Sequence, residues 1–273
     1  MQHLENSKKV IELQSLEGRI ALVSGGAGYL GSVMACALAE MGADIAIVDR
    51  NEEAGVNVCD YIYNNLGLNT KFYKADLTND KEVGAIPHIV AKDFGGVDIL
   101  INAAAIVIDK YIEGWAVDFE KQKSSLWKDA LQLNLTSAFT LARESNKYLK
   151  VTGKGSIINI ISHYGIVGPD WSLYEDTTMG NAAAYAASKG GLLNLTKWLS
   201  STLAPKVRVN SITPGGVFRD HKDPFLERYI NRTPMRRMGK EEDFKGAIVF
   251  LASEMSGYIT GHNLVVDGGL TVI

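Results

Sequence analysis

A tyrosine and a lysine lie one helical turn apart, at Tyr185 and Lys189. Residues four apart on a helix share a face with their β-carbons about 5–6 Å apart, so the ammonium of Lys189 can approach the phenol of Tyr185. A free tyrosine has a pKa of about 10, and a neighbouring cation lowers it. The pair predicts a tyrosine that moves a proton near neutral pH. A surface tyrosine beside a solvated lysine is the alternative.

Three further polar side chains fall where they could assist that tyrosine. Ser162 follows the apolar run 157–161, at the edge where ligands of open α/β sheets bind, and its hydroxyl could orient a carbonyl. Asn134 lies in a long apolar helical segment, where an amide is costly unless its hydrogen bonds are made; it could hold a water near Lys189. His163 is a candidate substrate contact. The alternatives are structural: a turn-capping serine and a histidine that only packs.

A glycine-rich loop far upstream predicts a dinucleotide site. The stretch Ser24-Gly25-Gly26-Ala27-Gly28-Tyr29-Leu30-Gly31 follows an expected strand and opens an expected helix. In that context glycines permit a tight turn and a close approach of the backbone to a pyrophosphate, which the helix amino terminus then binds. The loop is therefore the predicted cofactor end of the molecule.

Acidic residues near the next strands indicate which dinucleotide binds. Asp49 ends the second expected strand, where a carboxylate accepts ribose hydroxyls and repels a 2′-phosphate, so NAD is favoured over NADP. Arg50 leaves NADP open, because a guanidinium can pair with that phosphate. Asp76 could reach the adenine or simply start a turn. Further cofactor contacts are expected at Leu77, Asn102, Ala103, Ala104, Pro214, Gly215 and Val217.

Short apolar runs alternate with amphipathic stretches, which predicts an α/β fold: a single-domain Rossmann fold with a doubly wound, seven-stranded parallel sheet and helices on both faces. The expected strands are Ile20–Ser24, Ile45–Asp49, Lys71–Ala75, Ile99–Asn102, Ser156–Ile161, Val207–Ile212 and Asn263–Val266. The expected helices are Gly31–Met41, Glu52–Leu66, Lys81–Phe94, Leu126–Tyr148, Ala182–Thr202 and Glu241–Ala252. A mobile N-terminal arm over residues 1–17 is expected before one domain at 18–273, with a substrate lid near 216–238.

Composition narrows the function classes. The 273 residues are 46% hydrophobic and 22% charged, as in ordinary soluble proteins, and the formal charge of -3 gives no electrostatic reason to expect nucleic acid or an anionic membrane. Two cysteines, Cys36 and Cys59, favour a reducing compartment. No apolar run reaches the ~18 residues of a membrane-spanning helix, and the first 17 residues are too polar for a secretory signal. We expect a cytoplasmic protein with a small-molecule substrate and no metal.

Taken in order, these motifs resemble the short-chain dehydrogenase/reductase family over nearly the whole chain. The family's Asn, Ser, Tyr and Lys tetrad matches Asn134, Ser162, Tyr185 and Lys189, and residues 258–269 are similar to its C-terminal signature. The resemblance implies that Tyr185 is the acid or base and that Ser162 polarises the substrate oxygen. It also implies that Lys189 holds the cofactor ribose and lowers the tyrosine pKa, while Asn134 supports a proton relay. Hydride transfer between nicotinamide C4 and a secondary alcohol or ketone follows.

Two departures concern the cofactor. The glycines follow the spacing of the family's extended branch and put Tyr29 where classical members have their middle glycine. The short stretch after Asp267 favours the classical branch instead, because extended members carry a larger C-terminal region. Arg219 stands where classical members often have a threonine, which leaves the nicotinamide contacts open.

A third departure concerns the substrate side. The step from Ser162 to Tyr185 is longer than usual, and the extra segment, residues 168–178, is called the insertion below; we expect it to overhang the substrate. Tyr174, inside it, has no lysine four residues later and is rejected as the acid-base residue.

Basic side chains crowd the expected lid: Arg219, His221, Lys222, Arg228, Arg232, Arg236 and Arg237. They favour an anionic or polyhydroxylated ligand, with Arg219 as a candidate substrate contact, although interleaved acids leave open a lid whose charges face water. With the polar insertion, they favour a sugar, sugar acid or sugar phosphate. The chain is similar to gluconate-dehydrogenase-like members of the family and to oxidoreductases of bacterial surface-sugar pathways.

Two other functions remain as hypotheses. A sugar-nucleotide epimerase or dehydratase would keep tightly bound NAD and release no NADH, and a non-catalytic NAD-binding module would not need the tetrad. The resemblance also implies a homo-oligomer, a tetramer or dimer, in which the helices near Leu126–Tyr148 and Ala182–Thr202 meet their symmetry mates.

Overall fold

Within the computed structural model, which describes residues 7–106 and 112–273, seven parallel strands form one sheet in the order β3-β2-β1-β4-β5-β6-β7. The strands are β1 (Ile20–Ser24), β2 (Asp44–Asp49), β3 (Thr70–Lys74), β4 (Ile99–Asn102), β5 (Gly155–Ile160), β6 (Val207–Pro214) and β7 (Asn263–Val266). The predicted fold class is confirmed, and each strand lies within two residues of its expected bounds. β6 runs on to Pro214, which brings the following loop to the site.

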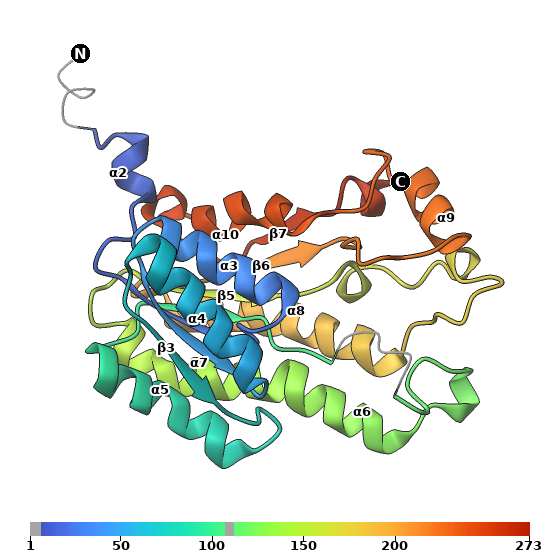
Figure 1. Cartoon of the computed structure of the whole chain (residues 1–273), viewed down its shortest axis with the longest axis horizontal. Helices are drawn as coiled ribbons and strands as arrows, with labels where there is room; N and C mark the ends of the chain where they lie inside the picture. The colour runs from blue at the N-terminus through green and yellow to red at the C-terminus, as the bar shows by residue number, and fades with distance from the viewer. Residues whose placement is uncertain (1–6, 107–111) are drawn as a thin grey trace.

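Helices pack on both faces of this sheet (Figure 1). One face carries α3 (Tyr29–Glu40), α4 (Glu52–Leu66) and α10 (Lys245–Ala252), and the other carries α5 (Asp80–Phe94), α7 (Ser137–Leu149) and α8 (Ala183–Leu203). Successive strand residues point to opposite faces. Val23 accordingly packs in the core beneath α3, whereas its neighbour Leu22 packs in the core beneath α5. Both faces of the strands are buried, which explains their continuous apolar runs.

Besides the expected helix Glu241–Ala252, which begins as a 3₁₀ turn over Glu241–Phe244 and continues as α10, two helical segments differ from the sequence expectation. The single helix expected over Leu126–Tyr148 consists of α6 (Ser124–Leu131), a π-helical turn (Gln132–Thr136) and α7. The expected lid contains a short amphipathic helix, α9 (Phe225–Arg232), that was not predicted. Both differences lie beside the catalytic residues, and π-helical turns are frequent at functional sites.

The N-terminal segment holds a short helix, α2 (Val10–Gln14), and the side chain of Leu16 is fully buried in the core beneath α3. The first six residues of the expected arm lie outside the described residues. No helix in the described ranges is long and apolar enough to cross a bilayer.

The sheet changes its winding direction between β1 and β4, and this places the cofactor end. β1 pairs with β2 on one side and with β4 on the other, and Ser24 lies opposite Asn102 at the carboxyl edge. Dinucleotides bind in the crevice at such a switch point. A buried polar chain supports this edge: Asn102 Nδ2 donates to Asn159 Oδ1 at 2.8 Å, and Asn159 Nδ2 donates to Thr196 Oγ1 at 2.9 Å, joining β4, β5 and α8.

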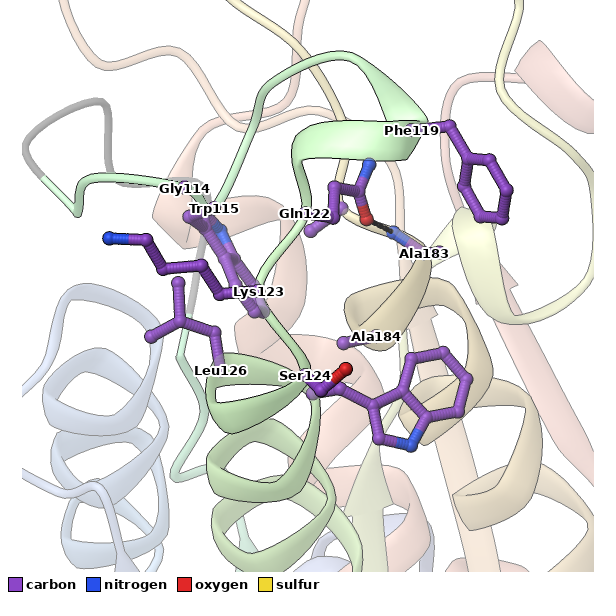
Figure 2. A pocket seen from close by; sticks show the side chains of 11 residues that line it. Gly114, Trp115, Phe119, Gln122, Lys123, Ser124, Leu126, Ala183 and Ala184 are labelled. Atoms are coloured by element: carbon purple, nitrogen blue, oxygen red, sulfur yellow. Dashed lines mark hydrogen bonds between the residues drawn. The ribbon is translucent and has the colours of Figure 1, made fainter.

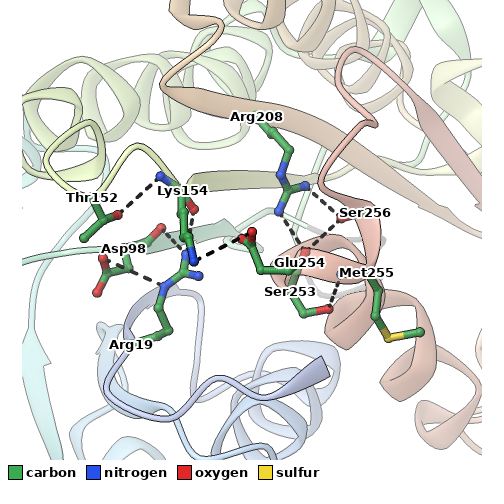
Figure 3. A network of polar contacts seen from close by, with 9 residues as sticks. All are labelled: Arg19, Asp98, Thr152, Lys154, Arg208, Ser253, Glu254, Met255 and Ser256. Atoms are coloured by element: carbon green, nitrogen blue, oxygen red, sulfur yellow. Dashed lines mark hydrogen bonds and ion pairs between the residues drawn. The ribbon is translucent and has the colours of Figure 1, made fainter. Parts of the chain in front are cut away.

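The amino edge of the sheet is fastened by a separate polar network (Figure 3). Arg19 Nη2 donates to the Lys154 carbonyl at 2.7 Å, and Asp98 accepts from the Ile20 amide at 3.0 Å. Arg208 donates to the carbonyls of Leu251 and Ser253, both at 3.0 Å, and to Ser256 Oγ at 2.8 Å. The Arg19 and Asp98 contacts tie the entries of β1, β4 and β5 together, and Arg208 ties β6 to the end of α10, at the end remote from the predicted site.

Candidate active site

The glycine loop forms a cradle that a side chain would fill. Gly25 has a φ of +70°, and a β-carbon there would lie 2.6 Å from the backbone nitrogen of Ala104. A β-carbon on Gly31 would lie 2.1 Å from the carbonyl oxygen of Gly25. Gly28 is the N-cap of α3, so the amino terminus of that helix opens onto the loop. The loop therefore fits a pyrophosphate, held by backbone N–H groups at close range.

Asp49 fixes this loop to the end of β2. Its carboxylate accepts from the Ala27 amide at 3.2 Å and from the Asn51 amide at 3.0 Å, so it lies beside the glycine loop as the sequence predicts. Arg50 next to it is exposed. Asp76 Oδ1 accepts from the amide and hydroxyl of Thr78, and these bonds lower the pKa of Asp76. Asp76 thus makes the turn that the sequence offered as its alternative role.

The remaining predicted cofactor residues lie along the same edge. Ser24 Oγ donates to the Ile101 carbonyl at 3.2 Å, and Asn102 Oδ1 is buried without a hydrogen-bond partner among the described residues. Leu77 is buried in the core beneath α5. Beyond β6, Gly215 N donates to the Val266 carbonyl at 3.0 Å. Ala103, Ala104, Pro214 and Val217 complete the edge.

Tyr185, Ser162 and Lys189 come together as predicted. Ser162 lies close enough to Tyr185 to lower the pKa of its phenol, and Lys189 Nζ lies 5.9 Å from the centre of the Tyr185 ring. All three side chains are buried. Lys189 Nζ donates to the Ile160 carbonyl at 2.7 Å, which holds α8 against the end of β5. A serine hydroxyl at the tyrosine oxygen is the geometry needed to hold a substrate carbonyl or carbinol between them.

The electrostatics of the pair differ from the expectation. Burial raises the pKa of Tyr185 above its ordinary value, against the opposing effects of the Ser162 hydrogen bond and the Arg219 charge. Burial also lowers the pKa of Lys189 from 10.5 to about 7. Lys189 therefore carries only part of a charge near neutral pH, which is why its closeness does not lower the tyrosine pKa here. Desolvation, which helical spacing does not reveal, outweighs the proximity of the cation.

Asn134 lies in the π-helical turn and is 1% exposed. Its Oδ1 accepts from the Ile106 amide at 2.9 Å, and its Nδ2 donates to Ser188 Oγ at 2.9 Å. Ser188 Oγ donates in turn to the carbonyl oxygen of Tyr185 at 2.8 Å. These bonds use one acceptor site and one N–H of the amide and fix the backbone of α8 at Tyr185, and the water near Lys189 stays a prediction.

His163 is buried between the site and the β6 loop. Its ring lies beside the Pro214 backbone, and burial lowers its pKa to about 4. Its Nδ1 has no partner among the described residues. The ring also lies 3.9 Å from that of Tyr164, centre to centre. His163 is therefore a neutral side chain that positions the Pro214 loop, which is the structural role left open by the sequence.

Three tyrosines surround Tyr185 and form the wall of the site. The hydroxyls of Tyr164 and Tyr174 are hydrogen-bonded to each other, and the Tyr229 hydroxyl accepts from the Gly216 amide. Burial raises the pKa of each of these three phenols, so all stay protonated. As the sequence indicated, Tyr174 is not the acid-base residue. The insertion nevertheless brings it to the site. The aromatic residues of the insertion were the signal in the sequence for a role in the wall of the site.

Ion pairs join the insertion to the lid. Arg232 lies 3.3 Å from Asp170, and Arg228 lies 3.5 Å from Asp176 and donates to the Glu175 carbonyl. Tyr174 also packs against Phe225 of α9, with ring centres 5.4 Å apart. The insertion and the lid therefore form one cover over Tyr185.

These ion pairs change how the basic residues of the lid are interpreted. Besides Arg228 and Arg232, Arg237 pairs with Asp243 at 2.6 Å and Arg236 donates to the Asn231 carbonyl at 2.7 Å. Because protein groups pair with these four arginines, their charges do not by themselves indicate an anionic substrate. Arg219 is different: its guanidinium lies over the ring of Tyr29.

A pocket of about 310 Å³ lies near the amino ends of α6 and α8 (Figure 2). Gln122 crosses it and accepts from the Ala183 amide at 3.0 Å, capping α8. Trp115, Phe119 and Trp127 line its walls. None of the tetrad residues lines this pocket.

Comparisons with known proteins agree with this geometry. A family model described as enoyl-(acyl carrier protein) reductase matches residues 26–271. The 3-oxoacyl-[acyl-carrier-protein] reductase FabG of Vibrio cholerae is 34% identical over 266 residues, covering 95% of this chain and all of that protein. The sorbose reductase SOU1 of Candida albicans is 32% identical over 267 residues, covering 96% of this chain and 90% of its own. A gluconate 5-dehydrogenase from Burkholderia cenocepacia, solved with NADP and tartrate, has a TM-score of 0.85 at 28% identity, covering 97% of this chain and 100% of its own.

Proposed function

The chain belongs to the short-chain dehydrogenase/reductase family and is an NAD(P)-dependent oxidoreductase of the EC 1.1.1 class, and from this premise we propose that it interconverts a secondary alcohol and a ketone on a sugar-related substrate. The observation that carries the proposal is that Ser162 and Tyr185 are buried close together at the carboxyl edge, beside the glycine cradle. That arrangement provides one group to hold the substrate oxygen and one to exchange its proton.

A bound nicotinamide would supply the hydride acceptor for the carbinol carbon in the oxidation direction. The carbinol oxygen accepts a hydrogen bond from Ser162, and its proton passes to Tyr185. Lys189 lies behind the tyrosine ring, while the Ser162 hydroxyl and the Arg219 charge oppose the effect of burial on the Tyr185 pKa and so favour the phenolate that must accept this proton. Asn134 and Ser188 hold the first turn of α8 and so fix the direction of the phenol. The wall of protonated tyrosines keeps water from the reacting atoms.

Loss of activity in Tyr185→Phe is the primary test. Absorbance at 340 nm should report NADH formation by the wild-type chain with NAD and an active polyol or sugar acid. We expect Tyr185→Phe to lower kcat at least a hundredfold, because general acid-base catalysis contributes about 10²–10⁴-fold. Tyr258→Phe, at a fully exposed position, is the matched control and should keep wild-type rates. Activity that survives in Tyr185→Phe would rule out the proposed role.

NAD is the cofactor that we propose, on the basis of Asp49. Its carboxylate lies at the end of β2 against the glycine loop, where a 2′-phosphate would meet like charge. Asp49→Ser should therefore raise the ratio of kcat/KM for NADP over NAD at least tenfold, since like-charge contacts cost several kcal/mol. Arg50→Met should lower whatever NADP activity the wild-type chain has. A wild-type preference for NADP, the cofactor bound in the gluconate 5-dehydrogenase structure, would overturn this assignment.

A sugar, sugar acid or sugar phosphate is the substrate class that we propose. The supporting observations are the sorbose reductase among the relatives and the gluconate 5-dehydrogenase solved with tartrate. The deciding assay offers polyols, aldonic acids and sugar phosphates with NAD, and a 3-oxoacyl thioester with NADH as the competing class. Turnover of the thioester alone would reject the sugar assignment.

A homo-oligomer, a tetramer or dimer in the cytoplasm, completes the proposal. Large aromatic side chains stand exposed on the two helices expected at the interface: Phe139 on α7 and Trp198 on α8. The cysteines Cys36 and Cys59 are both free, which suits a reducing compartment. Sedimentation should give more than one chain per particle, and Trp198→Glu should shift it toward the monomer. A wild-type monomer at micromolar concentration would contradict the assembly.

A further inference from the structure

Two residues that depart from the family pattern meet in space. Tyr29 is the first residue of α3, inside the glycine loop, and its ring is 64% exposed. Arg219 follows the end of β6 by five residues, and its guanidinium carbon lies 4.2 Å from the centre of the Tyr29 ring. This cation–π contact joins the glycine loop to the start of the lid.

Arg219 lacks the acidic partner that other lid arginines have. Its Nε is buried without a hydrogen-bond partner, and no carboxylate pairs with its guanidinium within the ranges 7–106 and 112–273. By contrast, Arg228, Arg232 and Arg237 each pair with an aspartate. The Arg219 charge is nevertheless felt inside the site, because it lowers the pKa of Tyr185. An uncompensated cation therefore lies between the glycine loop and the catalytic phenol.

The orientation of the Arg219 guanidinium favours a contact with the cofactor. A guanidinium stacked on an aromatic ring keeps its in-plane N–H donors free, and these match two phosphate oxygens at once. Tyr29 belongs to the helix terminus that faces the expected pyrophosphate, so a group held on its ring is held beside that anion. The threonine-sized residue common in the family at position 219 would not reach the Tyr29 ring.

We propose that Arg219, oriented by Tyr29, binds the pyrophosphate of the cofactor from the lid side, opposite the backbone amides of the glycine loop. Tyr29 is a positioning residue in this arrangement and Arg219 is the cofactor ligand. Since Arg219 lies at the start of the lid, cofactor binding also fastens the lid over the site. This inference rests on the proposed dinucleotide function and adds a binding residue to it.

Binding of cofactor fragments tests the inference without catalysis. Calorimetry should compare ADP, which carries the pyrophosphate, with adenosine, which does not, on the full chain and its variants. We expect Arg219→Met to weaken ADP binding about 10- to 100-fold, the range for a charge-assisted hydrogen bond, while adenosine binding stays unchanged. Arg219→Lys should restore part of the loss. Lys222→Met removes an equal charge from an exposed position three residues further on and should bind ADP as the wild type does.

Variants of the ring test the positioning role. Tyr29→Phe keeps an aromatic face and should bind ADP within twofold of the wild type. Tyr29→Leu should weaken ADP binding about three- to tenfold, in line with the strength of a cation–π contact. Circular dichroism checks that each variant folds.

The outcomes separate this inference from the function beneath it. Failure of the wild-type chain to bind either ADP or NADH would reject the dinucleotide function itself. Wild-type binding that is unchanged in Arg219→Met would overturn the inference alone. Unchanged ADP binding together with a raised KM for carboxylated substrates would assign Arg219 to the substrate instead.

Discussion

Replacing Lys189 by methionine tests the electrostatics of the catalytic pair directly. Lys189 is 2% exposed, and its ammonium donates to the Ile160 carbonyl. Burial lowers its pKa from 10.5 to about 7. Between these two values the unfolded chain holds a proton that the folded chain has released. The free energy of unfolding of the wild type must therefore rise with pH across this window.

The size of the effect follows from the shift in pKa. A fall from 10.5 to about 7 corresponds to about 5 kcal/mol, at about 1.4 kcal/mol per pH unit. Below pH 7 the buried lysine imposes its full destabilising cost, and near pH 10 almost none of it remains. Methionine has no titratable group, but it also cannot donate a hydrogen bond to the Ile160 carbonyl. The loss of that bond costs about 1 kcal/mol of stability and does not vary with pH.

Urea unfolding of both chains at several pH values between 7 and 10, without cofactor, measures this difference. Subtracting one chain from the other cancels the buried tyrosines and cysteines, whose raised pKa values affect both equally. From pH 7 to pH 10 the free energy of unfolding of the wild type should rise by several kcal/mol relative to that of Lys189→Met. A difference that stays flat would refute the reasoning, because Lys189 would then keep its full charge in the folded chain.

Two further substitutions probe the cradle and the cover. Gly31→Ala should weaken NADH binding at least tenfold and cost about 1–3 kcal/mol of stability, because the added methyl would lie 2.1 Å from the Gly25 carbonyl. Gly246→Ala is the control, because its methyl meets nothing within 4 Å. If the two variants gave equal NADH titrations, the proposed role of the cradle would be contradicted. Arg228→Met frees the insertion from α9 and should raise substrate KM severalfold, with faster chymotryptic cleavage in the insertion. Lys222→Met should change neither, and an intact insertion in Arg228→Met would show that the ion pair does not hold the cover.

The strands and the Tyr185–Lys189 pair could be predicted from sequence because each leaves a local signal, whereas Asn134 and Ser162 were assigned to the tetrad through the family resemblance. Buried parallel strands appear as short apolar runs, and Tyr185 and Lys189 are one helical turn apart. The helix α9 escaped prediction because it is only eight residues long and half of its residues are polar. The π-helical turn at Gln132–Thr136 escaped because its altered hydrogen bonding leaves no distinctive pattern of residue types.

Contacts between distant segments were beyond the reach of sequence patterns. The basic residues of the lid were visible, but their acidic partners in the insertion lie more than fifty residues away, so the arginines read as free charges. Tyr29 and Arg219 were each noticed as departures, and only the fold brings them together. The lowered pKa of Lys189 depends on complete burial, which helical spacing does not specify.

The Arg19 and Arg208 network at the amino edge bears on how new substrate preferences can be engineered. Most of its acceptors are backbone carbonyls, which keep their positions whatever side chains are exchanged at the opposite edge. Libraries randomised in the insertion and α9 therefore leave the main fastening of the strands intact. The surface that recognises the substrate can therefore be redesigned without changing the contacts at the amino edge of the sheet.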